Sequence, residues 1–293
     1  MEDILTALAL RLKQKDNSAN KGTNGTLTVA AGSELYRGAA ALASSAALRC
    51  GVGIVRLVSV EKVISSAAAR LPECVFLPTE SENGAMSYRD FKRKMPAFSK
   101  SRAVLAGCGM TDCADTGNII AELIKYGGYQ LIIDADGLNS IKNRPELLKS
   151  AALPPVITPH IGEMARLTGA SADAIKSDRE KTAAEFSRKY NCITVLKDCK
   201  TVISSPEGKL FVCDRPNAGL AKGGSGDVLS GIISSFAAQG YDAFDAAVCG
   251  AALHSLAAES AREKLTEYSM LPSDIVAEIP GVFARIGKTR NYR

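Results

Sequence analysis

The chain has 293 residues, of which 46% are hydrophobic and 23% charged, and its formal net charge at pH 7 is +5. This composition is that of an ordinary globular protein and excludes a disordered or fibrous chain. Trp is absent, aromatic residues make up 5%, and the basic residues form no tract, so we expect no nucleic-acid partner.

Short β-branched and aliphatic runs alternate with longer Ala-rich or amphipathic stretches. In chain order, the predicted strands are residues 27–31, 54–59, 103–106, 131–133, 156–158 and 194–196. The predicted helices are residues 38–49, 61–70, 115–125, 178–190, 226–238 and 242–263. Strands that are apolar throughout are buried on both faces, so this alternation predicts a mostly parallel sheet between two helical layers.

The pattern changes after the last of these strands. Residues 201–204 and 209–213 flank the turn-rich segment SPEG, which predicts a β-hairpin and an antiparallel edge on the sheet. No internal repeat or long linker divides the chain, so we expect residues 1–293 to form a single domain, with residues 1–25 as an N-terminal lead-in.

The sequence also indicates a compartment. No signal peptide is recognisable at the N-terminus, and no apolar run is long enough for a membrane span, so we expect a soluble protein without a membrane partner. The eight cysteines form no CxxC pair, and several lie in apolar runs where a free thiol behaves as a small hydrophobic group. Reduced thiols of this kind favour the cytoplasm.

The strongest functional signal is the glycine-dense run NAGLAKGGSGDVLSG at residues 217–231, which leads into an apolar helix. The backbone N–H groups of such a loop can surround a phosphate, and the helix adds unpaired donors and the positive end of its dipole. Asp227 then lies in the first helical turn, where it serves either as a general base or only as an acidic group facing the helix dipole. The spacing fits neither the P-loop nor GxGxxG.

With this loop late in the chain and behind a hairpin, the sequence resembles the ribokinase-like superfamily of small-molecule kinases. Four further segments resemble one branch of it, the ADP- or ATP-dependent NAD(P)H-hydrate dehydratases. They are GSELYRGAA at 32–40, DADGLN at 134–139, TPHIGE at 158–163 and LKDCKT at 196–201. The resemblance runs from residue 21 to about residue 259. It implies a ribokinase-like three-layer α/β/α sandwich with a mostly parallel central sheet and an antiparallel hairpin edge.

The resemblance also implies a function. Such an enzyme is a lyase of metabolite repair that dehydrates (6S)-NADHX and NADPHX to NADH and NADPH through a phosphorylated intermediate. Its co-substrate is ADP or ATP and its cofactor Mg²⁺, and Lys222 resembles the bacterial form of the family, which implies ADP. A kinase acting on a vitamin alcohol remains the alternative, because the loop around Asp227 would serve either reaction.

Partners follow from the same resemblance. It implies a homo-oligomer, commonly a tetramer, and an NAD(P)HX epimerase that acts in the same pathway. Since only residues 1–26 precede the first predicted strand, we expect the epimerase to be a separate chain.

By resemblance, individual residues acquire roles. Asp227 is the catalytic base, and the hydrated substrate is expected to contact Ala39, Gly107, Gly109, His160 and Asp227. The nucleotide is expected to contact Lys197, Asp198, Cys199, Lys200, Thr201, Gly223, Gly224, Ser225 and Gly226. Polar residues at strand ends, namely Asp136, Asn139 and Glu163, are either supports for Mg²⁺-bound water or helix caps, and no metal ligand is assigned.

Two positions depart from the family pattern. Asp198 stands where Gly is usual, and Cys108 interrupts what is usually Gly-Pro-Gly. Two key residues have an alternative interpretation: His160 as a histidine satisfied by backbone at a strand end, and Lys197 as a solvated surface residue. His254 is expected to pack inside a helix, with a role on the nucleotide side as the alternative.

Overall fold

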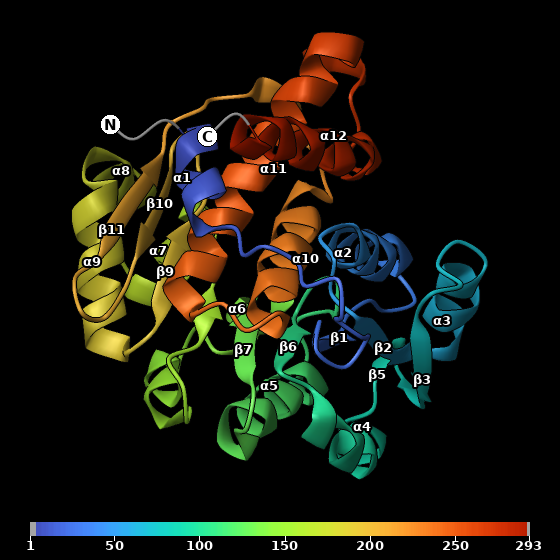
Figure 1. The fold of residues 1–293 in the computed structure, drawn as a ribbon. Coiled ribbons are helices and arrows are strands. Elements are labelled where there is room, and N and C mark those ends of the chain that lie inside the picture. The colour runs from blue at the N-terminus through green and yellow to red at the C-terminus, as the bar shows by residue number, and fades with distance from the viewer. Residues whose placement is uncertain (1–3, 292–293) are drawn as a thin grey trace.

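The computed structural model describes residues 4–291, with side chains to residue 287, and is built on a nine-stranded sheet (Figure 1). Its strands lie in the order β11-β10-β9-β8-β7-β6-β1-β2-β3. They are β1 (Thr26–Ala30), β2 (Ile54–Val60), β3 (Val75–Thr79), β6 (Ala103–Ala106), β7 (Gln130–Ile133), β8 (Val156–Ile157), β9 (Ile193–Leu196), β10 (Thr201–Ser204) and β11 (Leu210–Cys213). The strands from β3 to β9 pair in parallel, whereas β10 and β11 are antiparallel. The predicted parallel sheet with a hairpin edge is confirmed.

Helices cover both faces of this sheet (Figure 1). They are α1 (Ile4–Arg11), α2 (Arg37–Arg49), α3 (Glu61–Ala68), α4 (Tyr88–Lys94), α5 (Ala114–Tyr126), α6 (Asp136–Ser140), α7 (Ile161–Thr168), α8 (Ala172–Ser177), α9 (Arg179–Tyr190), α10 (Ser225–Ala238), α11 (Ala243–Ser269) and α12 (Pro272–Asn291). On one face α10 packs between α2 and α11, with α1 and α12 against α11. Right-handed crossovers place α5 and α9 on the other face. No helix among residues 4–291 is long and apolar enough to cross a membrane.

Helix α10 is the element that holds the glycine-rich loop in place. Twelve of its fourteen residues are buried, and its serines Ser234 and Ser235 satisfy their hydroxyls on the backbone carbonyls of Ser230 and Ala47. At Gly231 a Cβ would stand 2.2 Å from the carbonyl oxygen of Ala43, so only glycine permits this approach of α2 and α10. The N-terminus of α10 is therefore fixed by dense packing along its whole length.

The chain reverses its progress across the sheet between β1 and β6. From β1 it continues to β2 and β3, whereas from β6 it continues to β7, β8 and β9 in the opposite direction. Such a reversal opens a crevice at the carboxyl ends of the strands, where open α/β sheets bind their ligands. The two loops that follow these strands meet there, since the N–H of Gly32 donates to the carbonyl of Cys108 over 2.8 Å.

Several elements were not predicted, among them α1, β3 and α12. Helix α1 lies inside the segment expected to be a lead-in, with Leu8 fully buried and Arg11 paired to Asp245 of α11. Strand β3 is an edge strand in which only Thr79 is buried, and Pro78 interrupts its short apolar run. Helix α12 follows α11 directly and begins at Pro272. Residues 1–3 and 292–293 of the predicted domain lie outside the described residues.

Candidate functional site

A cavity of about 860 Å³ lies at the carboxyl edge of the sheet, beside the N-terminus of α10. The ends of β8 and β9, the start of α10 and the middle of α11 all contribute to its wall. Predicted site residues that line it are His160, Glu163, Lys197, Asp198, Cys199, Thr201, Gly224, Ser225, Gly226 and Asp227. Segments that are far apart in the chain, from Asp134 to Ser255, are thus brought together around one space.

Other predicted residues do not line this cavity. Lys200 pairs with Asp214 at 2.6 Å on the surface, and Gly223 is an exposed neighbour of the lining glycines. Ala39, Gly107 and Gly109 gather at the crevice between β1 and β6 instead. A Cβ at Gly109 would stand 2.8 Å from that of Ala39.

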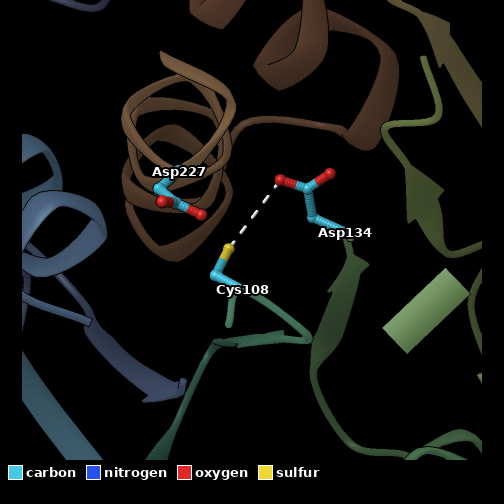
Figure 2. A group of neighbouring side chains, drawn as sticks. All are labelled: Cys108, Asp134 and Asp227. Atoms are coloured by element: carbon cyan, nitrogen blue, oxygen red, sulfur yellow. Dashed lines mark hydrogen bonds between the residues drawn. The ribbon is translucent and has the colours of Figure 1, made fainter. Parts of the chain in front are cut away.

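Gly107 connects that crevice to the cavity. It has a φ of +122°, and a Cβ there would stand 1.9 Å from the carbonyl oxygen of Asp134, so both its conformation and its surroundings require glycine. The next residue, Cys108, is fully buried and reaches the carboxylates of Asp134 and Asp227 (Figure 2). The region expected to hold the substrate therefore adjoins Asp227 from the side opposite the nucleotide loop.

Asp227 lies in the first turn of α10, where its surroundings disfavour the ionised carboxylate. Burial, and then repulsion by the nearby carboxylate of Asp134, raise the pKa of Asp227 to about 7, against smaller opposing effects of Cys108 and Lys197. Burial also raises the pKa of the Cys108 thiol well above its usual range, so the thiol keeps its proton. A carboxylate with a pKa near neutrality both accepts and releases a proton readily, as a general base must.

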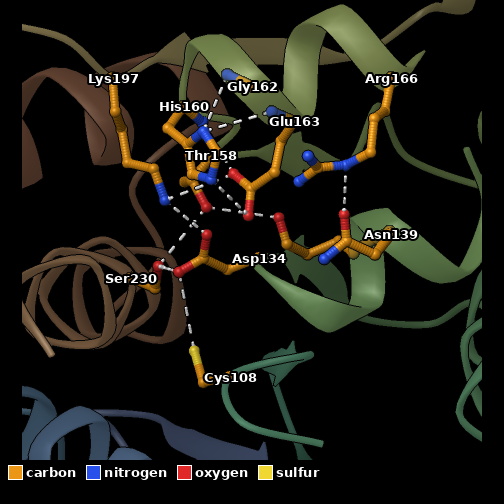
Figure 3. A network of polar contacts seen from close by, with 11 residues as sticks. Cys108, Asp134, Asn139, Thr158, His160, Gly162, Glu163, Arg166, Lys197 and Ser230 are labelled. Atoms are coloured by element: carbon orange, nitrogen blue, oxygen red, sulfur yellow. Dashed lines mark hydrogen bonds and ion pairs between the residues drawn. The ribbon is translucent and has the colours of Figure 1, made fainter. Parts of the chain in front are cut away.

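Asp134 is the centre of a buried polar network (Figure 3). It is 1% exposed, and it accepts hydrogen bonds from Nζ of Lys197 at 2.7 Å and from Oγ of Ser230 at 2.5 Å. Burial alone would raise the pKa of Asp134, but Lys197 and these hydrogen bonds hold it below its usual value. Asp134 and, at 4.0 Å, Glu163 raise the pKa of Lys197 despite its burial. Lys197 is thus a buried, charged residue of the cavity wall and not a solvated one.

His160 makes hydrogen bonds to backbone at the end of a strand, as one interpretation of the sequence expected, and it also lines the cavity, as the other expected. Its Nδ1 accepts the N–H groups of Gly162 at 2.9 Å and Glu163 at 3.2 Å, and Glu163 accepts the N–H of His160 at 2.8 Å, which completes a capping box for α7. Burial, Lys197 and Arg166 lower the pKa of His160. Because Nδ1 accepts, the neutral ring carries its proton on Nε2, which lies 3.5 Å from Oε1 of Glu163 at the wall of the cavity.

The departure at Asp198 is compensated within the structure. Its Oδ2 accepts two hydrogen bonds from Arg179 of α9, at 2.8 Å from Nε and 2.5 Å from Nη2. Burial opposes ionisation, but this bidentate pair lowers the pKa of Asp198. The carboxylate therefore remains charged while Arg179 balances its charge. This pair could not be predicted from the sequence because its members come from different elements.

Lys222 does not direct its charge into the cavity. Its Nζ donates to the carbonyl oxygens of Tyr268 and Met270, each at 2.7 Å. These carbonyls belong to the end of α11 and the connection to α12. Lys222 thereby ties the rim of the glycine-rich loop to the C-terminal helices.

The predicted supports for Mg²⁺-bound water are only partly brought together. Asp136 accepts the N–H of Thr111 at 2.8 Å, and Asn139 accepts Nε of Arg166 at 2.9 Å; neither lines the cavity. The ligand atoms of Cys108, Asp134 and Asp227 lie within 4.8 Å of one another (Figure 2). A thiol is a poor ligand for Mg²⁺, which prefers oxygen, so this trio does not fit the ion as a set of direct ligands.

Comparison with known proteins points to one family. The sequence model of a family described as NAD(P)H-hydrate dehydratase matches residues 27–281. The ADP-dependent (S)-NAD(P)H-hydrate dehydratase of Xanthomonas campestris is 30% identical over 283 residues, which are 96% of each chain. A bifunctional NAD(P)H-hydrate repair enzyme of Moorella thermoacetica is 32% identical over 97% of this chain, which spans only 54% of that relative. This chain is thus about half as long as that relative.

A solved structure is similar over nearly the whole chain. It is that of the ADP/ATP-dependent NAD(P)H-hydrate dehydratase from Bacillus subtilis, co-crystallized with ATP and Mg²⁺. The TM-score is 0.83, the sequence identity is 26%, and the match covers 97% of both chains. The predicted α/β/α fold is confirmed by this likeness together with the sheet described above.

Proposed function

Because this chain belongs to the NAD(P)H-hydrate dehydratase family, we propose that it dehydrates (6S)-NADHX and NADPHX to NADH and NADPH with ADP or ATP as co-substrate. One observation carries the proposal beyond family membership. Asp227, whose pKa is raised to about 7, lies in the first turn of α10. This end of the helix and the ammonium of Lys197 line the same cavity. A base beside a phosphate site is what phosphorylation of a hydroxyl group requires.

In the first step of the proposed reaction, the carboxylate of Asp227 takes the proton of the substrate hydroxyl on ring carbon 6. The hydroxyl oxygen attacks the terminal phosphorus of ADP, the bond to the bridging oxygen breaks, and AMP leaves. The N–H groups of Gly224 and Gly226 and the ammonium of Lys197 stabilise the charge on the transferring group. Hydroxide is thereby converted into phosphate, a much better leaving group.

In the second step the bond between carbon 6 and the phosphate oxygen breaks, driven by the lone pair of the ring nitrogen. The departing phosphate takes a proton from carbon 5, and the electrons of that bond form the double bond of the dihydronicotinamide. Asp227 releases its proton to solvent, which its pKa near neutrality favours. The overall products are NADH or NADPH, inorganic phosphate and AMP.

Other residues would position the two substrates. We propose that the dihydropyridine lies against Ala39, Gly107 and Gly109 in the crevice and accepts a hydrogen bond from Nε2 of His160. The nucleotide would lie along residues 197–201 and the glycine-rich loop, with Arg179 keeping the charge of Asp198 from opposing its phosphates. Supporting this arrangement, Asp227 stands between the two regions.

We also include Mg²⁺ in the proposal. The donor set around Asp227 does not suit direct coordination, so the ion would arrive with the nucleotide phosphates and be held through water by oxygens such as those of Asp227 and Glu163. Its chemical contribution would be to neutralise charge on the phosphates. Asp136 and Asn139 would act only indirectly, Asp136 through the N–H of Thr111 and Asn139 through Arg166.

We further propose a cytoplasmic homo-oligomer, a tetramer, that works together with an NAD(P)HX epimerase. Eight free cysteines support a reducing compartment. Exposed apolar side chains support self-association, among them Leu35 at 81% and Tyr268 at 94% exposed. The word bifunctional in the name of the Moorella relative supports a second repair activity that accompanies dehydration.

The deciding experiment supplies the purified protein with NADHX, Mg²⁺ and either ADP or ATP, and follows the return of dihydronicotinamide absorbance together with released phosphate. We expect recovery with one nucleotide, one phosphate per NADH, and none without nucleotide. Consumption of nucleotide with a vitamin alcohol, and a stable phosphate ester as product, would instead establish the kinase. The ester distinguishes the two because the dehydratase does not release it.

A further inference from the structure

Two buried polar atoms in the cavity wall have no hydrogen-bond partner. They are Oγ of Ser225 and Nε2 of His254. Both side chains are largely enclosed, with 7% of each residue exposed, and both line the cavity. Buried polar atoms in native proteins are nearly always satisfied, so an unsatisfied pair that faces one cavity marks a place for a ligand.

The location of the pair indicates the charge of that ligand. Ser225 is the first residue of α10, a helix of fourteen residues, and follows Gly224 at a φ of +101°. No side chain caps this helix end, so its first N–H groups and the positive end of its dipole remain available to an anion. Lys197 adds an ammonium group, because a Cβ at Gly226 would stand 3.3 Å from its Nζ.

His254 reaches the same place from a different element. It lies in the middle of α11, which packs along α10, and it is the only histidine of α11. Ser225 and His254 therefore approach the end of α10 from its first turn and from the neighbouring helix. The hydroxyl of Ser225 and Nε2 of His254 have no partner in the fold, whereas the other ring nitrogen of His254 hydrogen-bonds to the backbone of Ser225 and keeps the imidazole beside the end of α10.

We propose that Oγ of Ser225 and Nε2 of His254 together bind a phosphate oxygen of the adenine nucleotide, below the backbone N–H groups of the glycine-rich loop. This inference rests on the proposed function in so far as the nucleotide is the co-substrate. It makes His254 a nucleotide-binding residue and not only a packed one. The serine hydroxyl can donate to an anion directly, and the imidazole donates from Nε2 once that nitrogen carries a proton.

The protonation state of His254 makes the proposal measurable. Burial lowers the pKa of His254 to about 4, so the ring is neutral in the free protein at pH 7. A phosphate oxygen only accepts hydrogen bonds, so Nε2 must carry a proton when the phosphate is bound. The ¹⁵N chemical shift of that nitrogen reports its proton directly. The chain has only two histidines, so the spectrum of histidine-labelled protein is simple.

The first experiment titrates ¹⁵N-histidine-labelled protein at pH 7 with adenosine, AMP, ADP and inorganic phosphate, while calorimetry measures binding. His254→Gln identifies the signals by their loss. We expect AMP and ADP to move the Nε2 signal of His254 to the value of a protonated nitrogen, and adenosine to leave it in place. Movement with adenosine equal to that with AMP would assign the pair to the nucleoside and overturn the phosphate contact.

The second experiment compares Ser225→Ala and His254→Gln with Ser234→Ala. Ser234 is also a buried serine of α10, but its hydroxyl already donates to the carbonyl of Ser230 and does not line the cavity. We expect KM for ADP to rise about tenfold in each of the first two variants, as for loss of a hydrogen bond to a charged group. KM for NADHX and kcat should change less than KM for ADP, and Ser234→Ala should change none of them.

The outcomes separate this inference from the proposed function. If ADP binds without moving the His254 signal, the inference is wrong while the dehydratase proposal stands. If His254 responds to ADP but no hydrated cofactor is dehydrated, the inference stands and the proposed function fails. Absence of any nucleotide binding overturns both. Should a variant be too unstable to assay, the titration of the unmodified protein still decides the matter.

Discussion

Nζ of Lys197 lies 2.7 Å from Oδ1 of Asp134, a side chain that is only 1% exposed. The two residues belong to the ends of different strands and hold each other charged inside the cavity wall. Asp134 also repels the carboxylate of Asp227 and so contributes to the raised pKa of that residue. The ion pair of Lys197 and Asp134 thus holds the ammonium group near the proposed phosphate site and helps to raise the pKa of Asp227, the proposed base.

Replacing Lys197 by Met should destabilise the fold. The substitution leaves the buried charge of Asp134 unpaired, and loss of one partner of such a pair costs about 3–5 kcal/mol in the free energy of unfolding. Urea unfolding followed by circular dichroism measures this cost. The double variant Lys197→Met with Asp134→Asn should recover part of the loss, because no uncompensated charge remains. A double variant that is less stable than the single one would contradict the ion-pair account.

Asp227→Asn should abolish turnover while leaving ADP binding nearly unchanged. An amide cannot take the hydroxyl proton, and removal of a general base lowers rates by about 10²–10⁴. The measurements are kcat with NADHX and the affinity for ADP by calorimetry. Asp173→Asn on the surface of α8 is the matched control and should behave as the unmodified protein. Retained turnover in Asp227→Asn would remove this residue from the chemical step.

The pH dependence of the reaction follows from the pKa of Asp227, which is raised to about 7. A base acts only when ionised, so kcat/KM should rise with pH through this value and reach a plateau above it. At pH 6 the rate should be about tenfold below the plateau. An unperturbed aspartate would give a rate that is constant over this range, and a constant profile would therefore count against the raised pKa.

Gly226→Val should weaken nucleotide binding. A Cβ at this position would stand 3.3 Å from Nζ of Lys197 and 3.7 Å from Oδ2 of Asp134, and the branched side chain would occupy the space of the bound anion. We expect Kd for ADP to rise at least about tenfold, comparable to the loss of one hydrogen bond to a charged group. Gly281→Val in α12, where a Cβ would meet open space, is the control. Equal affinity in both variants would place the phosphate elsewhere.

Arg179→Ala should expose the charge of Asp198 to the nucleotide. Without its bidentate partner, the carboxylate repels phosphates, and KM for ADP should rise about three- to tenfold, more at low ionic strength. The double variant Arg179→Ala with Asp198→Gly should return KM close to the original value. Steady-state kinetics at two salt concentrations tests both points. No change in KM would show that Asp198 is remote from the nucleotide.

Much of the sheet could be predicted because its strands are buried on both faces. Residues 103–106 and 201–204 agree with β6 and β10 at both ends, and the other predicted strands agree to within one residue. Strand β3 was not predicted because Pro78, which cannot donate a hydrogen bond to a neighbouring strand, ends its apolar run after three residues. Helix α1 was not predicted because its apolar residues occupy only two turns within a polar segment.

The candidate site was predictable only where it is continuous in the sequence. The loop before Asp227 and the segment around Lys197 could be recognised, since each is a short continuous stretch whose residue types indicate a chemical role. Pairs between distant elements could not, because Asp198 gives no indication of Arg179, and His254 looks like any helix residue. The assignments of Ala39, Gly107 and Gly109 to the substrate came from resemblance and stay predictions.

We expect the C-terminal helices to influence, through Lys222, how long the nucleotide stays bound. The ammonium of Lys222 joins the glycine-rich loop to the carbonyls of Tyr268 and Met270, so the loop cannot move without breaking two hydrogen bonds at the junction of α11 and α12. In the proposed reaction, AMP would leave through the cavity that this loop borders. Disturbance of α12, by mutation or by a neighbouring subunit, should therefore change how quickly the spent nucleotide is released while leaving proton transfer at Asp227 as it was.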